Sequence, residues 1–181
     1  MNTRWLGTIL IVCTLVLTLN DFRPKNPGDT LDSIAYLIWG IGGVCGIAGL
    51  IRLNALGSNT VARALGFLPM IGFAFFVLSA ALQLGGFITP GTPIYSVLVW
   101  IAWLAMLVGM LVVGILTIAA KRWQGWRRFV PLLAMVMFPI GLTIGNAIGI
   151  GGVISGAFWV LLGYVIATAE PAPTVQPSVT A

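Results

Sequence analysis

The sequence contains no histidine, and its 181 residues include only four acidic side chains beside nine lysines and arginines. The missing imidazole excludes His-ligated haem, zinc sites that depend on histidine, and His-based acid or base catalysis. Cysteine is scarce too, since Cys13 and Cys45 are the only two and form no CxxC motif. We expect them to be small packing residues rather than a disulfide or a metal pair. The sequence therefore predicts a protein that is not an enzyme and that holds no cofactor and no metal.

Charge is absent from five long stretches of the chain. Hydrophobic residues make up 59% of the sequence and charged residues 7%, and the mean hydropathy is +1.07, whereas an average soluble domain is about 25% charged. The uncharged stretches cover residues 5–19, 33–50, 64–86, 94–120 and 129–169. A transmembrane helix needs about 20 predominantly apolar residues. This composition is typical of an integral membrane protein.

The last uncharged stretch is roughly twice as long as one span requires. Its middle reads GNAIGIGG, residues 145–152, and clustered glycines weaken a helix and favour a turn; a re-entrant loop is the alternative. The sequence thus predicts an all-α integral membrane protein, a bundle of six transmembrane helices in a single domain 1–169. The expected spans are about 5–20, 33–51, 63–86, 95–120, 129–148 and 151–169, followed by a flexible C-terminal tail, 170–181. Pro69 and Pro139 should kink the third and fifth spans.

The few charges indicate the orientation. Lysine and arginine collect in short cytoplasmic loops, and with the N-terminus inside, seven of the nine basic residues fall on the inner side. The sequence therefore predicts an N-in/C-in, multi-pass protein of the cytoplasmic (cell) membrane. Four of the seven lie in KRWQGWRR, where Trp123 and Trp126 should take headgroup-level positions. A marker of topology is the interpretation that we favour for this turn, and the alternative is a patch for anionic lipid or an acidic partner: Lys121, Arg122, Arg127 and Arg128.

Uncharged polar side chains near the expected outer ends form a second candidate site. They should share one depth in the membrane and can converge on a small neutral ligand or a lipid headgroup. Local hydrogen bonding to loops, other helices or water is the simpler interpretation, and we favour it. The candidate cluster is Gln83, Thr143, Asn146, Tyr36 and Tyr95.

Glycines spaced four apart predict close helix packing. Small residues let helix backbones approach each other in lipid, where the hydrophobic effect gives helices little mutual attraction. Packing within the chain and contact with another subunit explain this spacing equally well. The predicted packing glycines are Gly42, Gly46, Gly141, Gly145, Gly149, Gly152 and Gly156.

Met106 and Met110 also stand four apart. This MxxxM spacing resembles the motif of high-affinity copper transporters, and the resemblance covers those five residues. It implies soft sulfur ligands for Cu(I). Those transporters have three spans and a Met-rich outer tail, which this N-terminus lacks, and we favour methionines that fill gaps in the core.

Together these observations predict a non-catalytic accessory, assembly or interaction subunit in the membrane. Its partners are expected to be the lipid bilayer and another membrane protein or a second copy of the chain. Nucleic acid is not expected, because no folded module presents base-reading side chains. The alternative is a permease or channel-like carrier of a small neutral or lipidic substrate.

Overall fold

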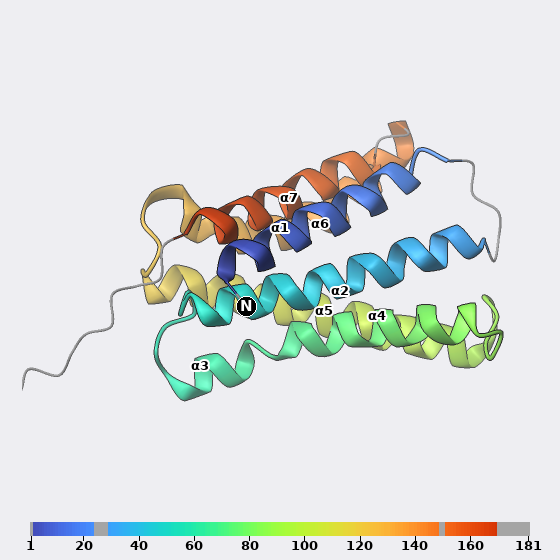
Figure 1. Cartoon of the computed structure of the whole chain (residues 1–181), viewed down its shortest axis with the longest axis horizontal. Coiled ribbons are helices and arrows are strands. Elements are labelled where there is room, and N and C mark those ends of the chain that lie inside the picture. The colour runs from blue at the N-terminus through green and yellow to red at the C-terminus, as the bar shows by residue number, and fades with distance from the viewer. Residues whose placement is uncertain (1, 24–28, 149–150, 170–181) are drawn as a thin grey trace, which may run out of the picture.

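The computed structural model describes residues 2–23, 29–148 and 151–169, apart from the side chains of 142, 144–148 and 151, and this part of the chain is all-helical (Figure 1). The α-helices and one 3₁₀ helix follow each other in this order: α1 (Thr3–Asn20), α2 (Thr30–Arg52), α3 (Thr60–Leu65), α4 (Leu68–Leu84), α5 (Pro93–Ala120), η1 (Gly125–Phe129), α6 (Val130–Ile148) and α7 (Gly151–Thr168).

The long helices alternate in direction (Figure 1), and their contacts close into a ring. Helix α1 packs against α2 and α7, α4 packs against α2 and α5, and α6 packs against α5 and α7. Consecutive helices are therefore neighbours, as short connections between antiparallel helices require. The ring brings the first helix beside the last, so α1 and α7 pack together although they lie at opposite ends of the chain.

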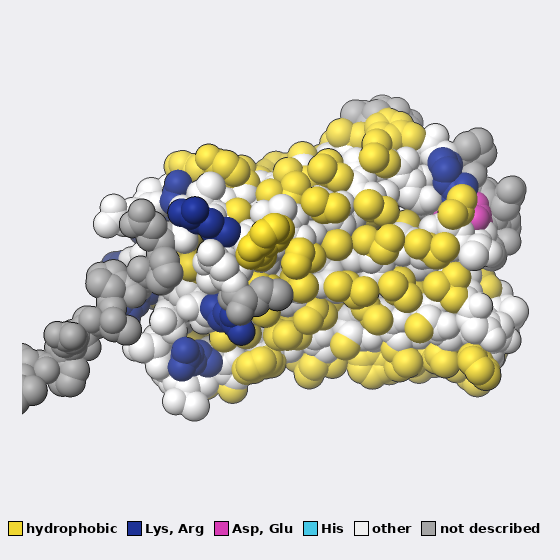
Figure 2. Space-filling model, viewed as in Figure 1, with side chains coloured by type: hydrophobic (Ala, Val, Ile, Leu, Met, Phe, Trp, Pro, Cys, Tyr) yellow, Lys and Arg dark blue, Asp and Glu magenta, His cyan; other side chains and the backbone are white. Residues whose placement is uncertain are grey.

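Four helical segments are long and apolar enough to cross a membrane: Thr3–Asn20, Thr30–Arg52, Thr60–Leu84 and Pro93–Ala120. A shorter apolar helix covers Gly152–Thr168. Figure 2 shows hydrophobic side chains over the middle of the bundle, and lysine and arginine mostly at one end. An apolar belt between polar ends is the surface that a bilayer requires of a helical membrane protein.

The helix break near residue 66 differs from the continuous span expected over 63–86. Helix α3 ends at Leu65 and α4 begins at Leu68. Pro69 lies in the first turn of α4, where a missing backbone N–H leaves no hydrogen bond unmade. The prediction that Pro69 kinks the inside of a helix is therefore wrong, whereas Pro139 does lie inside α6.

Aromatic side chains fill the centre of the ring. Trp39 on α2 is 1% exposed, and its ring centroid lies 5.2 to 5.8 Å from the rings of Phe73, Phe76, Phe138 and Trp159. These four rings belong to α4, α6 and α7. The indole N–H of Trp159 is buried and has no hydrogen-bond partner among the described residues. Its ring stands nearly perpendicular to its aromatic neighbours, an arrangement in which an N–H can meet an aromatic face.

Candidate functional site

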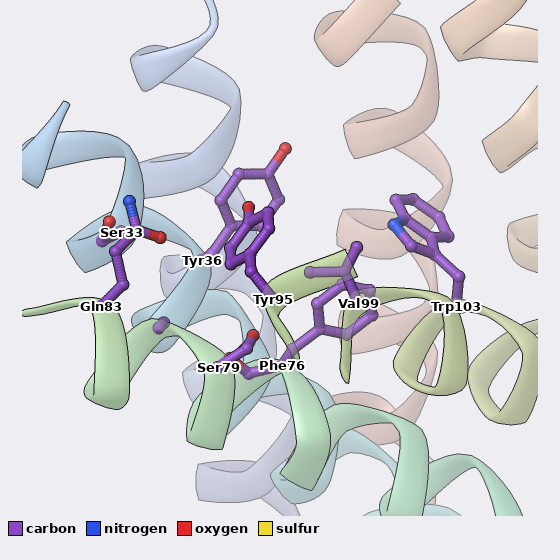
Figure 3. A pocket seen from close by; sticks show the side chains of 9 residues that line it. Ser33, Tyr36, Phe76, Ser79, Gln83, Tyr95, Val99 and Trp103 are labelled. Atoms are coloured by element: carbon purple, nitrogen blue, oxygen red, sulfur yellow. The ribbon is translucent and has the colours of Figure 1, made fainter. Parts of the chain in front are cut away.

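A pocket lies between α2, α4 and α5, at the end of the bundle where α2 begins and α4 ends (Figure 3). Its volume is about 100 Å³. Hydroxyl, phenol and amide groups share its wall with aromatic and aliphatic side chains, and none of the lining residues is acidic or basic. The lining consists of Ser33, Tyr36, Phe76, Ser79, Ala80, Gln83, Tyr95, Val99 and Trp103.

The pocket contains part of the polar cluster predicted from the sequence. Tyr36, Gln83 and Tyr95 all line it. Thr143 does not, because its side chain is exposed on α6 and its hydroxyl donates to the carbonyl oxygen of Pro139 over 2.8 Å. The side chain of Asn146 lies outside the described part of the chain.

Several lining residues escaped the sequence analysis although their spacing contains a signal. Residues 76, 79, 80 and 83 stand three or four apart on α4, and residues 95, 99 and 103 repeat every four positions on α5. Such spacing places side chains on one helix face. In the sequence, each face is indistinguishable from an ordinary core-facing helix surface. The pocket forms because α4 packs against both α2 and α5.

Helix capping fixes where the polar side chains stand. The Asp29 carboxylate caps α2 by accepting from the backbone N–H of Leu31 over 2.9 Å, and the Ser33 hydroxyl donates to the backbone oxygen of Asp29. The hydroxyl of Thr92 caps α5 by accepting from the backbone N–H of Tyr95. These caps satisfy free N–H groups of the first turns, and they set the start of both helices at the pocket.

Aromatic rings form the inner wall of the pocket. The Tyr36 ring stacks on Phe76 with centroids 6.5 Å apart, and Phe76 meets Trp103 edge to face at 5.3 Å. Trp103 in turn lies 5.2 Å from Phe138, and Phe76 lies 5.6 Å from Trp39. The inner wall of the pocket is thus continuous with the aromatic centre of the ring.

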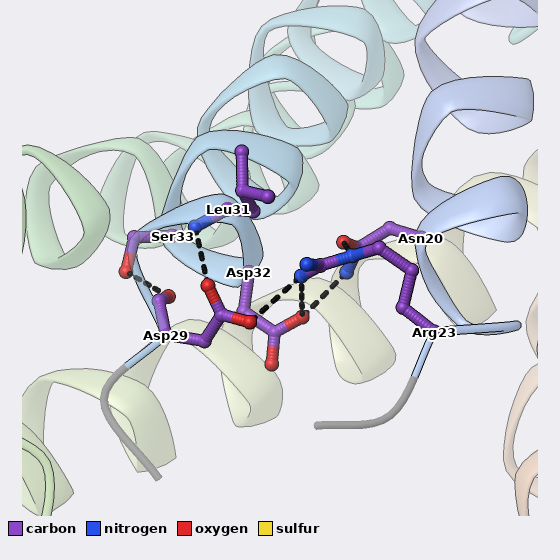
Figure 4. Close-up of polar contacts among 6 residues, drawn as sticks. All are labelled: Asn20, Arg23, Asp29, Leu31, Asp32 and Ser33. Atoms are coloured by element: carbon purple, nitrogen blue, oxygen red, sulfur yellow. Dashed lines mark hydrogen bonds and ion pairs between the residues drawn. The ribbon is translucent and has the colours of Figure 1, made fainter. Parts of the chain in front are cut away.

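An ionic network joins α1 to α2 at the same end of the bundle (Figure 4). The Arg23 guanidinium lies 2.8 Å from an oxygen of Asp29 and 3.9 Å from one of Asp32. The Asn20 amide accepts from Arg23 and donates to Asp32. The hydrogen bond from the backbone N–H of Leu31 lowers the pKa of the Asp29 carboxyl, and the hydrogen bond from Arg23 lowers it further. These contacts hold the end of α1 beside the start of α2, and none of the four residues lines the pocket.

The basic turn lies at the opposite end, between α5 and α6. Lys121 ends α5 in the left-handed conformation with φ of 51°, and Gly125 starts η1 with φ of 61°. Trp126 is 53% exposed, whereas Trp123 is 7% exposed and packs in the hydrophobic core; their headgroup-level position stays a prediction. The Arg128 guanidinium lies 4.8 Å from the centroid of the Phe129 ring. The turn thus places the four predicted basic residues in one short connection: Lys121, Arg122, Arg127 and Arg128.

The described packing glycines face other helices of the same chain. Gly42 lies against Cys13 of α1, Gly46 against Leu10 of α1, and Gly141 against Ile154 and Ser155 of α7. Gly152 and Gly156 lie against Asp21 and Thr18 at the end of α1. Contacts within the chain therefore account for these five positions. The surroundings of Gly145 and the whole of Gly149 lie outside the described part of the chain.

Two close backbone-to-backbone approaches of helices involve glycines that the spacing rule missed. A Cβ on Gly7 of α1 would overlap the backbone of Gly163 and Ala167 on α7. A Cβ on Gly72 of α4 would overlap the backbone of Met106 on α5. Neither glycine belongs to a stripe of glycines spaced four apart, so only the helix contacts reveal them.

The sulfur-containing side chains lie within the bundle. Met106 and Met110 are each 1% exposed and belong to the hydrophobic core. Cys13 is buried against Gly42, Cys45 is half-buried, and both thiols are free. Gap filling by polarizable side chains describes the environment of all four residues.

No protein-family model, no curated protein and no solved structure matches this chain. Its class therefore follows from its own features, which are an all-helical fold with four helical segments long and apolar enough to cross a membrane.

Proposed function

We propose that the chain is a six-span, N-in/C-in protein of the cytoplasmic membrane and serves as a non-catalytic accessory, assembly or interaction subunit. One observation carries the orientation: lysine and arginine gather mostly at one end of the bundle (Figure 2). The basic turn and the ends of α2 and α3 supply most of that charge. Under the positive-inside rule this end faces the cytoplasm.

The sealed centre of the ring supports a role without catalysis or conduction. Trp39, Phe73 and Trp159 are each at most 1% exposed and pack where the helices meet. Close packing of this kind leaves little room for water, and none of these three side chains is an acid or a base that could transfer a proton. The work of such a protein is done on its surface, through lipid or through a neighbouring membrane protein.

Reporter fusions test the orientation. A reporter placed after Ala181 and another inserted between Gln124 and Gly125 should lie on the same, cytoplasmic side. An insertion between Gly91 and Thr92, in the α4–α5 connection, should lie on the opposite side and serves as the matched control. Reporters at Ala181 and at Gln124 on opposite faces would overturn the threading.

Extraction into native nanodiscs tests the interaction role. We expect a particle that contains more protein than one chain of 19.2 kDa, measured by native mass spectrometry. Fixed stoichiometry, with a partner or with a second copy, would support a subunit. A particle holding one chain at every protein-to-lipid ratio would contradict it.

The pocket favours a second candidate, a carrier for a small neutral or lipidic substrate. Transport requires access from both sides, so the aromatic inner wall would have to move. In a background with Cys13→Ala and Cys45→Ala, a carrier should let Ser79→Cys react with impermeant thiol reagents from either side of the membrane. Labelling from the outer side alone would reject transport.

A further inference from the structure

We propose that the pocket between α2, α4 and α5 is a binding site for a small uncharged molecule with an apolar body and an amide or hydroxyl group. This goes beyond the subunit role, because it assigns a ligand class to this chain alone. It is also independent of the carrier alternative, because binding at one end requires no passage through the ring.

The charges around the pocket favour a neutral ligand. None of the lining residues is acidic or basic. At the same end of the bundle, Arg23 is paired with Asp29 and Asp32. An ion entering the pocket would lose water without gaining a counter-ion, and an unpaired buried charge is costly.

The hydrogen-bonding groups of the pocket favour a ligand with a polar end. Ser79 donates to the backbone oxygen of Phe76 over 3.0 Å, so its oxygen retains acceptor capacity. Within the described residues no hydrogen bond to protein is found for the Gln83 amide or the Tyr95 hydroxyl. The Gln83 amide offers both a hydrogen-bond donor and an acceptor, which matches an amide or a hydroxyl group of a ligand. It supplies no counter-charge for an ionic ligand.

The shape and size of the pocket favour a ligand whose remaining part is small and apolar. Phe76, Val99 and Trp103 lie on the side of the pocket away from Ser33 and Gln83 (Figure 3). A cavity of about 150 Å³ holds benzene, and this pocket is about 100 Å³. An apolar body of a few carbon atoms fills the inner part while its polar group stays beside Gln83. Water alone would leave the aromatic wall without contacts.

A matched series of small molecules tests the ligand class. The probes are isobutyramide, isobutyrate and isobutyramidinium, which share one shape and carry no charge, a negative charge and a positive charge at pH 7. Each is titrated against the full chain in nanodiscs by saturation-transfer NMR, with empty nanodiscs as reference. We expect isobutyramide to bind with a Kd on the order of 1 mM and both ions at least about tenfold more weakly. Acetamide should bind more weakly than isobutyramide, by about fourfold for each buried methylene lost.

Two variants of neighbouring residues on α4 locate the site. Ala80 is 4% exposed and lines the pocket, whereas Ala81 is exposed on the outside of the same helix. Ala80→Met fills the pocket and should weaken isobutyramide at least about tenfold, since the ligand and the new side chain compete for one volume. Ala81→Met adds the same side chain outside and should bind within about twofold of the original chain, because surface substitutions change little.

A third variant keeps the test decisive if Ala80→Met fails to fold. Gln83→Met removes the amide at nearly constant size and should weaken isobutyramide about fivefold. Equal binding of the three probes would overturn the proposal. So would unchanged affinity in both Ala80→Met and Gln83→Met, or a signal no greater than that of empty nanodiscs.

Discussion

Replacing the central tryptophan tests whether packing, rather than hydrophobicity, holds this bundle together. Trp39 is 1% exposed and touches four aromatic rings on three other helices. Trp100 on α5 is 73% exposed on the apolar side of the bundle. The same substitution, Trp→Ala, can therefore be made at the centre of the ring and on the surface that meets lipid.

The expected magnitude follows from the contacts of Trp39. In lipid the transfer term is small, because hydrocarbon tails are about as apolar as the core. Four aromatic pairs at about 0.5 to 1.5 kcal/mol each give about 2 to 6 kcal/mol, and Trp→Ala substitutions in packed cores cost about 3 to 5 kcal/mol. We expect Trp39→Ala to lower the free energy of unfolding by about 3 to 5 kcal/mol. For Trp100→Ala, lipid replaces the lost side chain and the cost should stay within about 0.5 kcal/mol.

Equilibrium unfolding in mixed micelles, with an increasing mole fraction of sodium dodecyl sulfate, measures both free energies. Far-ultraviolet circular dichroism and thiol accessibility of Cys13 report helix content and helix separation. A large loss at position 39 with little change at position 100 supports a packed aromatic centre. Equal losses at the two positions would refute the reasoning, because they would place both indoles in the same environment.

Three further predictions address the crossings, the ionic network and the basic turn. Gly72→Leu places a side chain on the α5 backbone and should cost about 1 to 3 kcal/mol or more, whereas Ala74→Leu on the exposed side of α4 should cost nothing measurable in the same unfolding assay. The pKa of Asp29 is lowered in the folded state. Its contribution to the free energy of unfolding is therefore present above the ordinary Asp pKa of about 3.9 and is lost as the pH falls through the lower folded value. Asp29→Ala should abolish this part of the acid dependence of the unfolding midpoint, and an unchanged acid profile would contradict it. Replacing both Arg127 and Arg128 with Gln should weaken retention of anionic lipid by about 1 kcal/mol for each residue, measured by native mass spectrometry, and persistence of the full effect in high salt would argue against an electrostatic cause.

The helices could be predicted from the sequence because lipid imposes a simple rule. Charged groups are expelled from the hydrocarbon. Helices α4, α5, α6 and α7 accordingly contain no charged residue, and α1 and α2 carry their few charges in their first or last turns. The break at Gly66 and Phe67 was not predicted, because both residues are apolar and composition alone gives no sign that the helix ends there. Asn59 caps the start of α3, and Pro69 lies in the first turn of α4. The proline is a local signal for the break within an apolar stretch.

The candidate site could be predicted only in part, because a pocket is a property of helix neighbours. Shared depth in the membrane was enough to suggest Tyr36, Gln83 and Tyr95. Depth alone could not separate them from Thr143, which lies on α6 and faces outward. The order of helices around the ring makes the distinction, and that order depends on backbone contacts such as those at Gly7 and Gly72.

The pocket and the packed centre share side chains, so ligand binding should affect the free energy of unfolding of the helix ring. Phe76 lines the pocket and also contacts Trp39, while Trp103 lines it and contacts Phe138 on α6. A molecule that binds the folded ring and not the unfolded chain stabilises it by about 1.4 kcal/mol at ten times its Kd. That stabilisation acts on contacts between α2, α4, α5 and α6, because those helices supply the shared rings. A ligand at one end of the bundle can therefore change how firmly the helices hold together, without any charge or polar path crossing the centre.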